Sequence, residues 1–504
     1  MHKQQERTVI KTFCFFLSAA LLVWMTLSAI PLPVARAGTI TVAGGVVDVD
    51  DTDGLCSLKE ALINANNDAA THLDCLAGSG ADTINLAAGA TYILNTVDND
   101  TDGPNGLPSI TSQIIINGNG ATIERSSIGG TPEFRIFHVD SSGTLRLNDL
   151  TIANGYLGSN RGGGIYNIGT VNISHSTLSD NIATSGGGVY NTGTVDINND
   201  SIISGNIATS GPGGGICNMG TLVDIRISNS TISGNTADTS GGGIFNEGTV
   251  DIGHSTLSDN TANTVGGGIY NYSGTVDISN STFSGNQASF GGGIYTNDTV
   301  NISHSTFFGN TATHGGSDGG GIYNNNATVN LKNTIIADNT SNNCVGTMTS
   351  QGYNLESGTD CGFNQAHDLQ NANAELGPLQ NNGGPTQTHA LQSDSPAIDA
   401  GSCTDITGNP VTTDQRGYTR PAGEGCDIGA FEFGSTTTPT PTETSTATST
   451  PTVTDTPTPT ETHTPTSTPT NTPTPTDTPT VTSTPTSTDT PTITPTPPTI
   501  AMAR

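Results

Sequence analysis

One region of the sequence places a basic residue among several carboxylates. Arg226 lies beside Asp196, Asp224 and Asp251 in three neighbouring repeats, the only place in the repeats where a base candidate meets several acids. A basic side chain that removes a proton beside carboxylates able to hold Ca²⁺ is a plausible way to cleave an acidic polysaccharide. Catalysis by Arg226 with these three aspartates is therefore one hypothesis. A plain salt bridge explains the same residues, and we favour that interpretation.

Two acidic patterns indicate cation binding. Asp98, Asp100 and Asp102 alternate before Gly103, like the first half of an EF-type Ca²⁺ loop, although position twelve is Ser109 instead of Glu. An acidic surface turn is the alternative. In addition, the second run of each repeat carries an outward polar residue, and stacked carboxylates there must gain protons, turn to solvent or bind a cation. This outward row comprises Asn172, Asp196, Asp251, Asp277, Asn301 and Asn330, with Asp224 or Arg226 in the longer repeat.

An aromatic row recurs beside the isoleucine of each repeat. We expect it to face outward, where stacked rings contribute about 0.5–1.5 kcal/mol per pair. Structural stacking is the simpler interpretation, and a flat platform for sugar rings is the other. The row comprises Tyr166, Tyr190, Phe245, Tyr270, Tyr295 and Tyr323, with Cys217 taking one place.

Three histidines share one repeat position and so suggest a metal site. His175, His254 and His304 are, however, two or three repeats apart. At about 4.8 Å per stacked strand, no single zinc ion can join them.

Six cysteines lie in near pairs, which makes disulfides the default in an exported chain. The spacings fit no CxxC zinc pattern, and the sequence leaves the actual pairing open. Cys217 is interpreted as a tolerated small apolar residue. The candidate cysteines are Cys56 and Cys75, Cys344 and Cys361, and Cys403 and Cys426.

The elements that must position these residues are sequence repeats. GGGIY or a close variant begins every 24 to 28 residues, and each repeat holds three short β-type runs with no helical period. Near-identical units stack best in register, so we predict an all-β right-handed parallel β-helix, or β-solenoid. The repeats begin at Gly162, Gly186, Gly213, Gly241, Gly266, Gly291 and Gly319.

In-register stacking would align equivalent residues into ladders about 4.8 Å apart. Three apolar rows are predicted to point inward, through the Ile of GGGIY, the V-x-I of the second run and the middle of the third run. Stacked amides can also hydrogen-bond from coil to coil. The predicted asparagine ladder is Asn181, Asn206, Asn235, Asn260, Asn286, Asn310 and Asn339.

The two ends of the chain differ from the repeats. The N-terminus has the basic start, apolar stretch and small-x-small ending of a secretory signal peptide, with an uncleaved anchor as the alternative. Ser57 and Glu60 have capping-box spacing and predict a short capping helix. The Thr/Pro-rich tail predicts an extended, disordered stalk. The expected parts are a signal peptide (1–37), an N-terminal cap (38–81), β-helix repeats (82–345), C-terminal coils and a further module (346–433) and the stalk (434–504).

The chain is strongly acidic, with a formal net charge of -30. After the predicted signal peptide only Lys59 and Lys332 remain as lysines. Such a surface lacks the basic patch that nucleic-acid binding requires and favours cations or cationic partners. We expect a monomer that does not bind nucleic acid.

Three segments resemble known families. DGLCSLKEALINANN resembles the CSLREA motif of secreted bacterial β-helix proteins, with Lys59 and Leu62 in place of Arg and Ile. Residues 376–432, which include LGPLQNNGGPTQTHALQ and TDQRGYTRPAGEGCDIGAFE, are similar to the choice-of-anchor Q domain. The GGGI and FxxN segments resemble repeats of chlamydial polymorphic membrane proteins. These resemblances imply a right-handed β-helix followed by a module that precedes a C-terminal anchoring region.

The sequence therefore predicts a secreted or cell-surface β-helix protein. We expect a non-catalytic, adhesin-like or structural envelope component that contacts carbohydrate or cell surfaces and attaches through its C-terminal stalk. The alternative is an extracellular polysaccharide lyase or glycoside hydrolase of the parallel β-helix type. Ca²⁺ is the only cofactor that the acidic patterns indicate.

Overall fold

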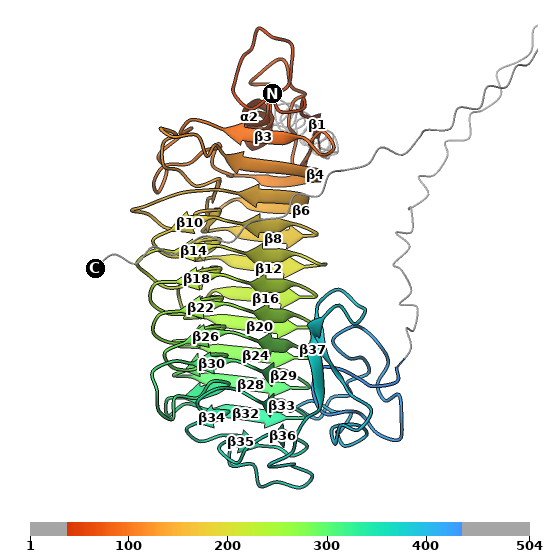
Figure 1. Ribbon diagram of the computed structural model, residues 1–504. Helices are drawn as coiled ribbons and strands as arrows, with labels where there is room; N and C mark the ends of the chain where they lie inside the picture. Colours follow the sequence, from red (N-terminus) through yellow and green to blue (C-terminus); the bar gives the residue numbers. More distant parts are fainter. Residues whose placement is uncertain (1–37, 436–504) are drawn as a thin grey trace, which may run out of the picture. The chain divides into compact units, whose positions relative to one another are not determined.

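Successive repeats fold into coils that stack along one axis (Figure 1). The computed structural model describes residues 38–435; the predicted signal peptide and nearly all of the predicted stalk lie outside them. Strands of neighbouring coils pair in parallel and in register, as Val250 with Val276 and Ile252 with Ile278 show. This confirms the predicted parallel β-helix. No helix within residues 38–435 is long and apolar enough to cross a membrane.

One coil consists of four short strands. In the coil that begins at Gly162 they are β7 (Ile165–Asn167), β8 (Thr170–Ser174), β9 (Thr177–Ser179) and β10 (Ile182–Ala183). The first three match the predicted runs. The fourth was not predicted, because a two-residue strand has no period that a sequence can show.

Equivalent strands stack into three long sheets of nine, 21 and six strands. The nine-stranded sheet adds β5 (Phe137–Val139), β11 (Val189–Asn191), β15 (Ile216–Asn218), β19 (Ile244–Asn246), β23 (Ile269–Asn271), β27 (Ile294–Thr296), β31 (Ile322–Asn324) and β34 (Cys344–Val345) to β7. The six-stranded sheet adds β14 (Ile207–Ala208), β18 (Thr236–Ala237), β22 (Thr261–Ala262), β26 (Gln287–Ala288) and β30 (Thr311–Ala312) to β10.

The 21-stranded sheet contains both the second and the third strand of each coil. Its second strands after β8 are β12 (Thr194–Asn198), β16 (Asp224–Ser228), β20 (Thr249–Gly253), β24 (Thr275–Ser279), β28 (Thr299–Ser303), β32 (Val329–Lys332) and β35 (Thr349–Ser350). Its third strands after β9 are β13 (Ile202–Ser204), β17 (Thr231–Ser233), β21 (Thr256–Ser258), β25 (Thr282–Ser284), β29 (Thr306–Phe308), β33 (Ile335–Ala337) and β36 (Leu355–Glu356). The first coils supply β1 (Thr39–Thr41), β2 (Asp82–Asn85), β3 (Thr91–Leu94), β4 (Gln113–Arg125) and β6 (Thr144–Ala153).

The predicted inward rows form the core of the stack. Their side chains are fully or almost fully buried, and the rings of Phe283 and Phe307 stack with centroids 4.5 Å apart. Each such side chain contributes about 1.5–3 kcal/mol on burial. Glycine triplets let the coils come close: a Cβ on Gly187 would lie 2.6 Å from the carbonyl oxygen of Gly214.

Buried asparagines form the predicted ladder at the turn after the third strand. Each Nδ2 donates to the Oδ1 of the next coil at 2.9–3.0 Å, from Asn181 to Asn339. A second asparagine ladder, which the sequence analysis missed, follows the first strand from Asn167 to Asn271 at 2.7–2.9 Å. In both ladders the buried amides also donate to backbone carbonyls, so buried polar groups find partners within and between coils.

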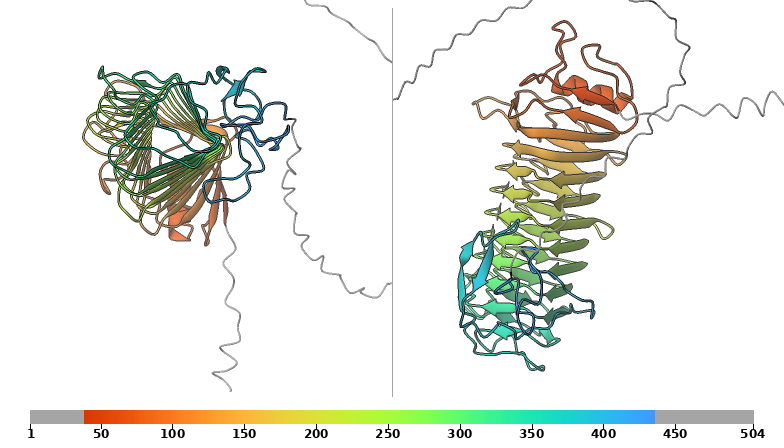
Figure 2. Two further views of the ribbon diagram at one scale, coloured as in Figure 1. Left: turned by 90° about the horizontal axis from the view of Figure 1, so that it is seen from below. Right: turned by 90° about the vertical axis from the view of Figure 1, so that its right-hand side faces the viewer.

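The N-terminal end of the stack is covered by α2 (Leu58–Asn67), as Figure 2 shows. Ser57 and Glu60 form the predicted capping box, and the helix buries Leu58 and Leu62 against the core. The Cys56–Cys75 disulfide joins the segments on either side of the helix. Disulfides also join Cys344 to Cys361 and Cys403 to Cys426, so each near pair of cysteines is bonded.

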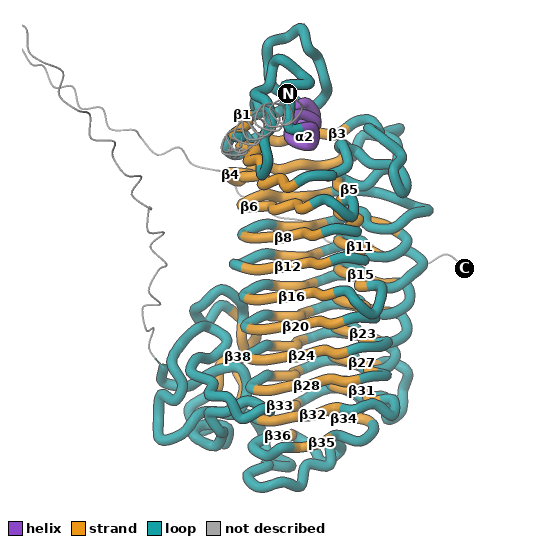
Figure 3. The backbone as a smooth tube through the Cα atoms, turned by 180° about the vertical axis from the view of Figure 1, so that it is seen from behind, coloured by secondary structure: helices purple, strands orange, loops and turns teal. Residues whose placement is uncertain are grey.

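After the last coil the chain turns back along the side of the stack. We call residues 376–435 the C-terminal return; it begins with the antiparallel pair β37 (Leu376–Gln380) and β38 (Thr388–Leu391). Figures 2 and 3 show it beside the coils instead of beyond them. The contact shows in the burial of the third strands: all three residues of β21 are buried, whereas the two outward residues of the equivalent β9 are only half-buried.

Candidate functional site

The outward row of the second strands is continuous along the stack. Arg226, not Asp224, occupies the row in the longer repeat: it pairs in register with Asp196 on one side and Asp251 on the other. Asp251 in turn pairs with Asp277. The row therefore holds one stacked pair of carboxylates with a guanidinium next to it.

Arg226 makes the salt bridge that the simpler interpretation predicted. Its Nη1 lies 3.5 Å from Oδ1 of Asp196, and its side chain is 62% exposed. Asp224 pairs in register with Thr194 and Thr249 instead, one row away. An exposed, charged guanidinium is a poor base, so the proposed catalytic role of Arg226 gains no support from this geometry.

A groove of about 520 Å³ runs between the outward row and the C-terminal return. Its floor is formed by Asp251, Asp277 and Asn301 with neighbouring serines, and its outer wall by residues 405–407 and 410–413. Lys332 anchors this wall, since its Nζ donates to Thr404 Oγ1 at 2.7 Å and to the Asp405 carbonyl at 3.0 Å. Carboxylate, amide and hydroxyl groups thus face a wall that includes the aliphatic side chains Ile406, Pro410 and Val411.

The groove is acidic, and the pKa values of two of its carboxyl groups are shifted in opposite directions. Burial and the neighbouring Asp277 raise the pKa of Asp251, although Arg226 opposes the shift. Burial also favours a raised pKa at Asp405, but hydrogen bonds from Thr407 and Asn409 outweigh it and lower the pKa. Asn301 Nδ2 donates to Asp277 Oδ1 at 2.8 Å. No lysine or arginine is among the residues that line the groove in the described chain.

Two of the three aspartates of the predicted Ca²⁺ loop have separate side-chain partners. Asp98 lies 3.7 Å from Lys59 Nζ, and Asp102 accepts a hydrogen bond from His138 at 3.1 Å. Within residues 38–435, Asp98, Asp100 and Asp102 do not gather their oxygens within 4.8 Å of one another. Ca²⁺ binding here stays a prediction that requires these side chains to rearrange.

His138 connects two of the residues in this loop. Its Nδ1 lies 2.9 Å from Ser109 Oγ, and its Nε2 lies 3.1 Å from Asp102 Oδ2. Hydrolases connect a nucleophilic serine, a histidine base and an orienting acid in the same order. His138 is, however, fully buried, and burial together with Arg135 lowers its pKa. A base in that environment resists taking a proton, so we interpret the chain of hydrogen bonds as structural.

The aromatic row is stacked, but it is not a continuous platform. Tyr166 and Tyr190 stack at 5.2 Å, and Tyr295 and Tyr323 at 4.8 Å. Tyr190 is only 3% exposed, because Arg161 covers its ring and donates to its hydroxyl at 2.8 Å. Burial raises the pKa of Tyr190 to about 12. Tyr270, Tyr295 and Tyr323 remain half-buried and could contact a ligand edge.

Cys217 fills its place in that row as a buried residue between Tyr190 and Phe245. Burial raises the pKa of its thiol. It therefore packs as a small apolar side chain, as predicted.

The three repeat-position histidines occupy the turn between the second and third strands. His175, His254 and His304 all have positive φ, between 49° and 54°, where neighbouring coils carry Asn or Asp. His175 is exposed, whereas the C-terminal return contacts the other two: Thr386 Oγ1 donates to the His254 carbonyl, and His304 Nε2 lies 2.9 Å from the Ser402 carbonyl. They serve separate contacts and do not converge.

Comparison with known proteins gives limited matches. Residues 229–247 and 280–297 match the Chlamydia polymorphic membrane protein repeat. Each segment contains a third strand, a ladder asparagine and a glycine triplet. No curated protein matches the chain. The crystal structure of pectate lyase Pel9A is similar over 79% of this chain and 97% of that one, with 13% identity and a TM-score of 0.45.

Proposed function

We propose that this protein is an exported, surface-displayed and non-catalytic β-helix protein that binds carbohydrate in the groove. The groove itself is the observation that carries the proposal. Its floor of carboxylates, amides and hydroxyls suits the hydroxyl groups of a sugar chain, and its aliphatic wall suits sugar C–H faces. The three groove aspartates favour a neutral or cationic glycan over an acidic one.

Export and surface display rest on separate support. Three disulfides are typical of an extracellular protein, and the matched repeat is named for a membrane protein family. The CSLREA and choice-of-anchor Q resemblances point the same way. Deletion of residues 434–504 tests attachment: the protein should move from the cell surface to the medium if the stalk holds it.

A glycan array with two matched variants tests groove binding. Ser279 lines the groove, and Ser174 holds the same ladder position four coils away, outside it. Ser279→Arg should abolish binding, whereas Ser174→Arg should leave it unchanged. Equal binding by both variants, or no binding by the wild-type chain, would contradict the proposal and leave a structural envelope role.

One observation favours an enzyme as the second candidate. A carboxyl with a raised pKa, Asp251, lies next to a second carboxylate, Asp277, in a groove, which is an arrangement used for general acid catalysis. Turnover of a polysaccharide panel, with and without Ca²⁺, separates this from binding alone. Activity that is lost in Asp277→Asn would favour a hydrolase, and activity that is lost in Arg226→Ala would favour a lyase.

A further inference from the structure

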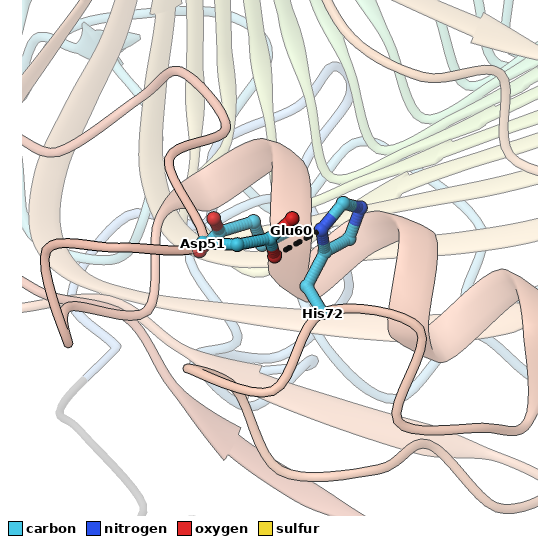
Figure 4. A group of neighbouring side chains, drawn as sticks. All are labelled: Asp51, Glu60 and His72. Carbon is cyan, nitrogen blue, oxygen red and sulfur yellow. Dashed lines mark hydrogen bonds and ion pairs between the residues drawn. The ribbon is translucent and has the colours of Figure 1, made fainter.

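Three metal-ligating side chains meet at the N-terminal cap, away from the groove. Figure 4 shows Asp51, Glu60 and His72 turned toward one another. One ligand atom from each lies within 4.8 Å of the others. We propose that these residues bind one divalent transition-metal ion of the Zn²⁺ class, and that this ion fastens the cap.

The three side chains come from separate segments that converge around α2. Asp51 lies on the loop before the helix, Glu60 in its first turn and His72 on the loop after it. The Cys56–Cys75 disulfide holds the two loops together. The covalent link therefore keeps the segments that carry the three ligands close together.

Hydrogen bonds orient two of the ligands. The His72 backbone N–H donates to Asn64 Oδ1 at 2.8 Å, and Asn64 Nδ2 donates back to the His72 carbonyl at 2.9 Å. The Glu60 oxygens accept backbone N–H groups from Asp50 and Ser57, both at 2.9 Å. Each carboxylate oxygen has a second lone pair that could bind a metal. Hydrogen bonds of this kind hold the metal-binding side chains in place in metal sites.

The donor set selects the ion. One imidazole and two carboxylates suit Zn²⁺, with ligand distances of about 2.0–2.2 Å, whereas Ca²⁺ takes oxygen ligands only. Tetrahedral coordination would place the ligand atoms about 3.3 Å apart. Asp51 Oδ1 and His72 Nδ1 are 2.8 Å apart now, so the ion would replace their hydrogen bond after a small rotation of exposed Asp51.

The negative charge of the N-terminal cap favours the binding of a cation. Glu60 is fully buried, and Lys59, the only lysine or arginine of residues 38–81, points away to Asp48 at 2.8 Å. The same segment carries aspartates on both sides of the helix. A bound divalent ion would neutralise a buried carboxylate that has no lysine or arginine partner among the described residues.

Isothermal titration of Zn²⁺ into the full-length, chelator-treated chain without a histidine tag tests the site. His72→Ala should weaken the tightest Zn²⁺ binding by at least about 100-fold, more than loss of an outer-shell partner does. His314→Ala is the matched control, because His314 also faces an aspartate, Asp318 at 3.7 Å, with no third ligand. It should leave that binding unchanged, and Ca²⁺ should not compete.

Hydrogen exchange of the wild-type chain tests the site without a variant, so the result cannot be affected by a variant that fails to fold. Zn²⁺ should slow exchange in the loops around Asp51 and His72 and leave the coils unchanged. The proposal is overturned if Zn²⁺ does not bind, if His72→Ala binds as tightly as the wild type, or if Zn²⁺ protects other segments only.

Discussion

His389 of the C-terminal return accepts a hydrogen bond from Ser284 of β25. Nε2 of His389 lies 2.9 Å from Ser284 Oγ, while Nδ1 lies 2.7 Å from the Gly377 carbonyl, which can only accept. Nδ1 is therefore the protonated nitrogen and Nε2 the acceptor. Burial lowers the pKa of His389, which keeps this neutral form. The return is thus joined to the coils by a buried imidazole whose charged form is disfavoured by burial.

Acid should weaken this junction. Burial lowers the pKa of His254 and His389, and lowers that of His304 to about 3. The folded state therefore binds fewer protons than the unfolded state, so stability falls as the pH drops from about 6.5 toward about 3. Limited proteolysis should cut the C-terminal return sooner at about pH 4.5 than at about pH 7. Asp427 opposes the effect, because burial raises its pKa to about 6.

A His304→Asn variant isolates the histidine contribution. Asparagine fits the positive φ of this turn, as Asn280 and Asn333 show in the neighbouring coils. The variant should lose less stability on acidification than the wild type, by up to about 2 kcal/mol at about pH 4.5. Equal acid sensitivity of the two proteins would show that His304 does not govern the junction.

Removing one partner of a buried ion pair should release the C-terminal return. Arg420 Nη1 lies 2.9 Å from Glu432 Oε2, and both side chains are fully buried. Arg420→Met leaves the Glu432 carboxylate unpaired, at a cost of about 3–5 kcal/mol. Protease should cleave residues 376–435, and groove binding should disappear with its outer wall. Arg146→Met, at an exposed position of the outward row, should change neither.

Substitution of a single asparagine of the ladder should lower the stability of the neighbouring coils. Asn260 Oδ1 accepts from the backbone and side chain of Asn235, and its Nδ2 donates to Asn286. Asn260→Ala leaves buried polar groups unpaired, which should lower local stability by about 2–3 kcal/mol. Hydrogen exchange in β18 and β22 should speed up accordingly. Asn263→Ala, which removes an exposed amide, should stay within about 0.5 kcal/mol of the wild type.

The stacked carboxylates of the groove should be mutually destabilising. Asp277→Asn removes the repulsion with Asp251 and should stabilise β20 and β24 by about 0.2–1 kcal/mol at low salt, less at high salt. Asn301→Asp extends the repulsion and should do the reverse. Melting curves at two salt concentrations measure both. If the row binds Ca²⁺, adding it should stabilise Asn301→Asp more than Asp277→Asn.

The features that could be predicted from the sequence are those whose residues recur at the same position of each repeat. The Ile and V-x-I rows, the ladder from Asn181 to Asn339 and the outward aromatic row all depend on contacts between equivalent residues of neighbouring coils. Once in-register stacking is assumed, each such contact follows from the repeat itself. The capping box of Ser57 and Glu60 was equally accessible because it is local.

The groove was not predictable, because it depends on a contact between segments without repeat symmetry. Nothing in the sequence shows that Gln415 Oε1 accepts a hydrogen bond from Thr282 at 2.6 Å. The third strands of most repeats begin with Thr, and only the turned-back chain distinguishes the covered ones. Likewise Asp51 and His72 are 21 residues apart around a helix, with no metal-binding spacing to mark them.

The chain leaves the described structure at Ser435, whose Oγ accepts a hydrogen bond from Arg416 within the C-terminal return. A pull on the chain beyond this point would therefore be applied at the flank of the stack and not at its tip. The load would reach the coils through the contacts of the return with β21, β25 and β29 before any ladder between coils is stretched. Mechanically, the return would be the release point, and the coils would be the part that stays intact.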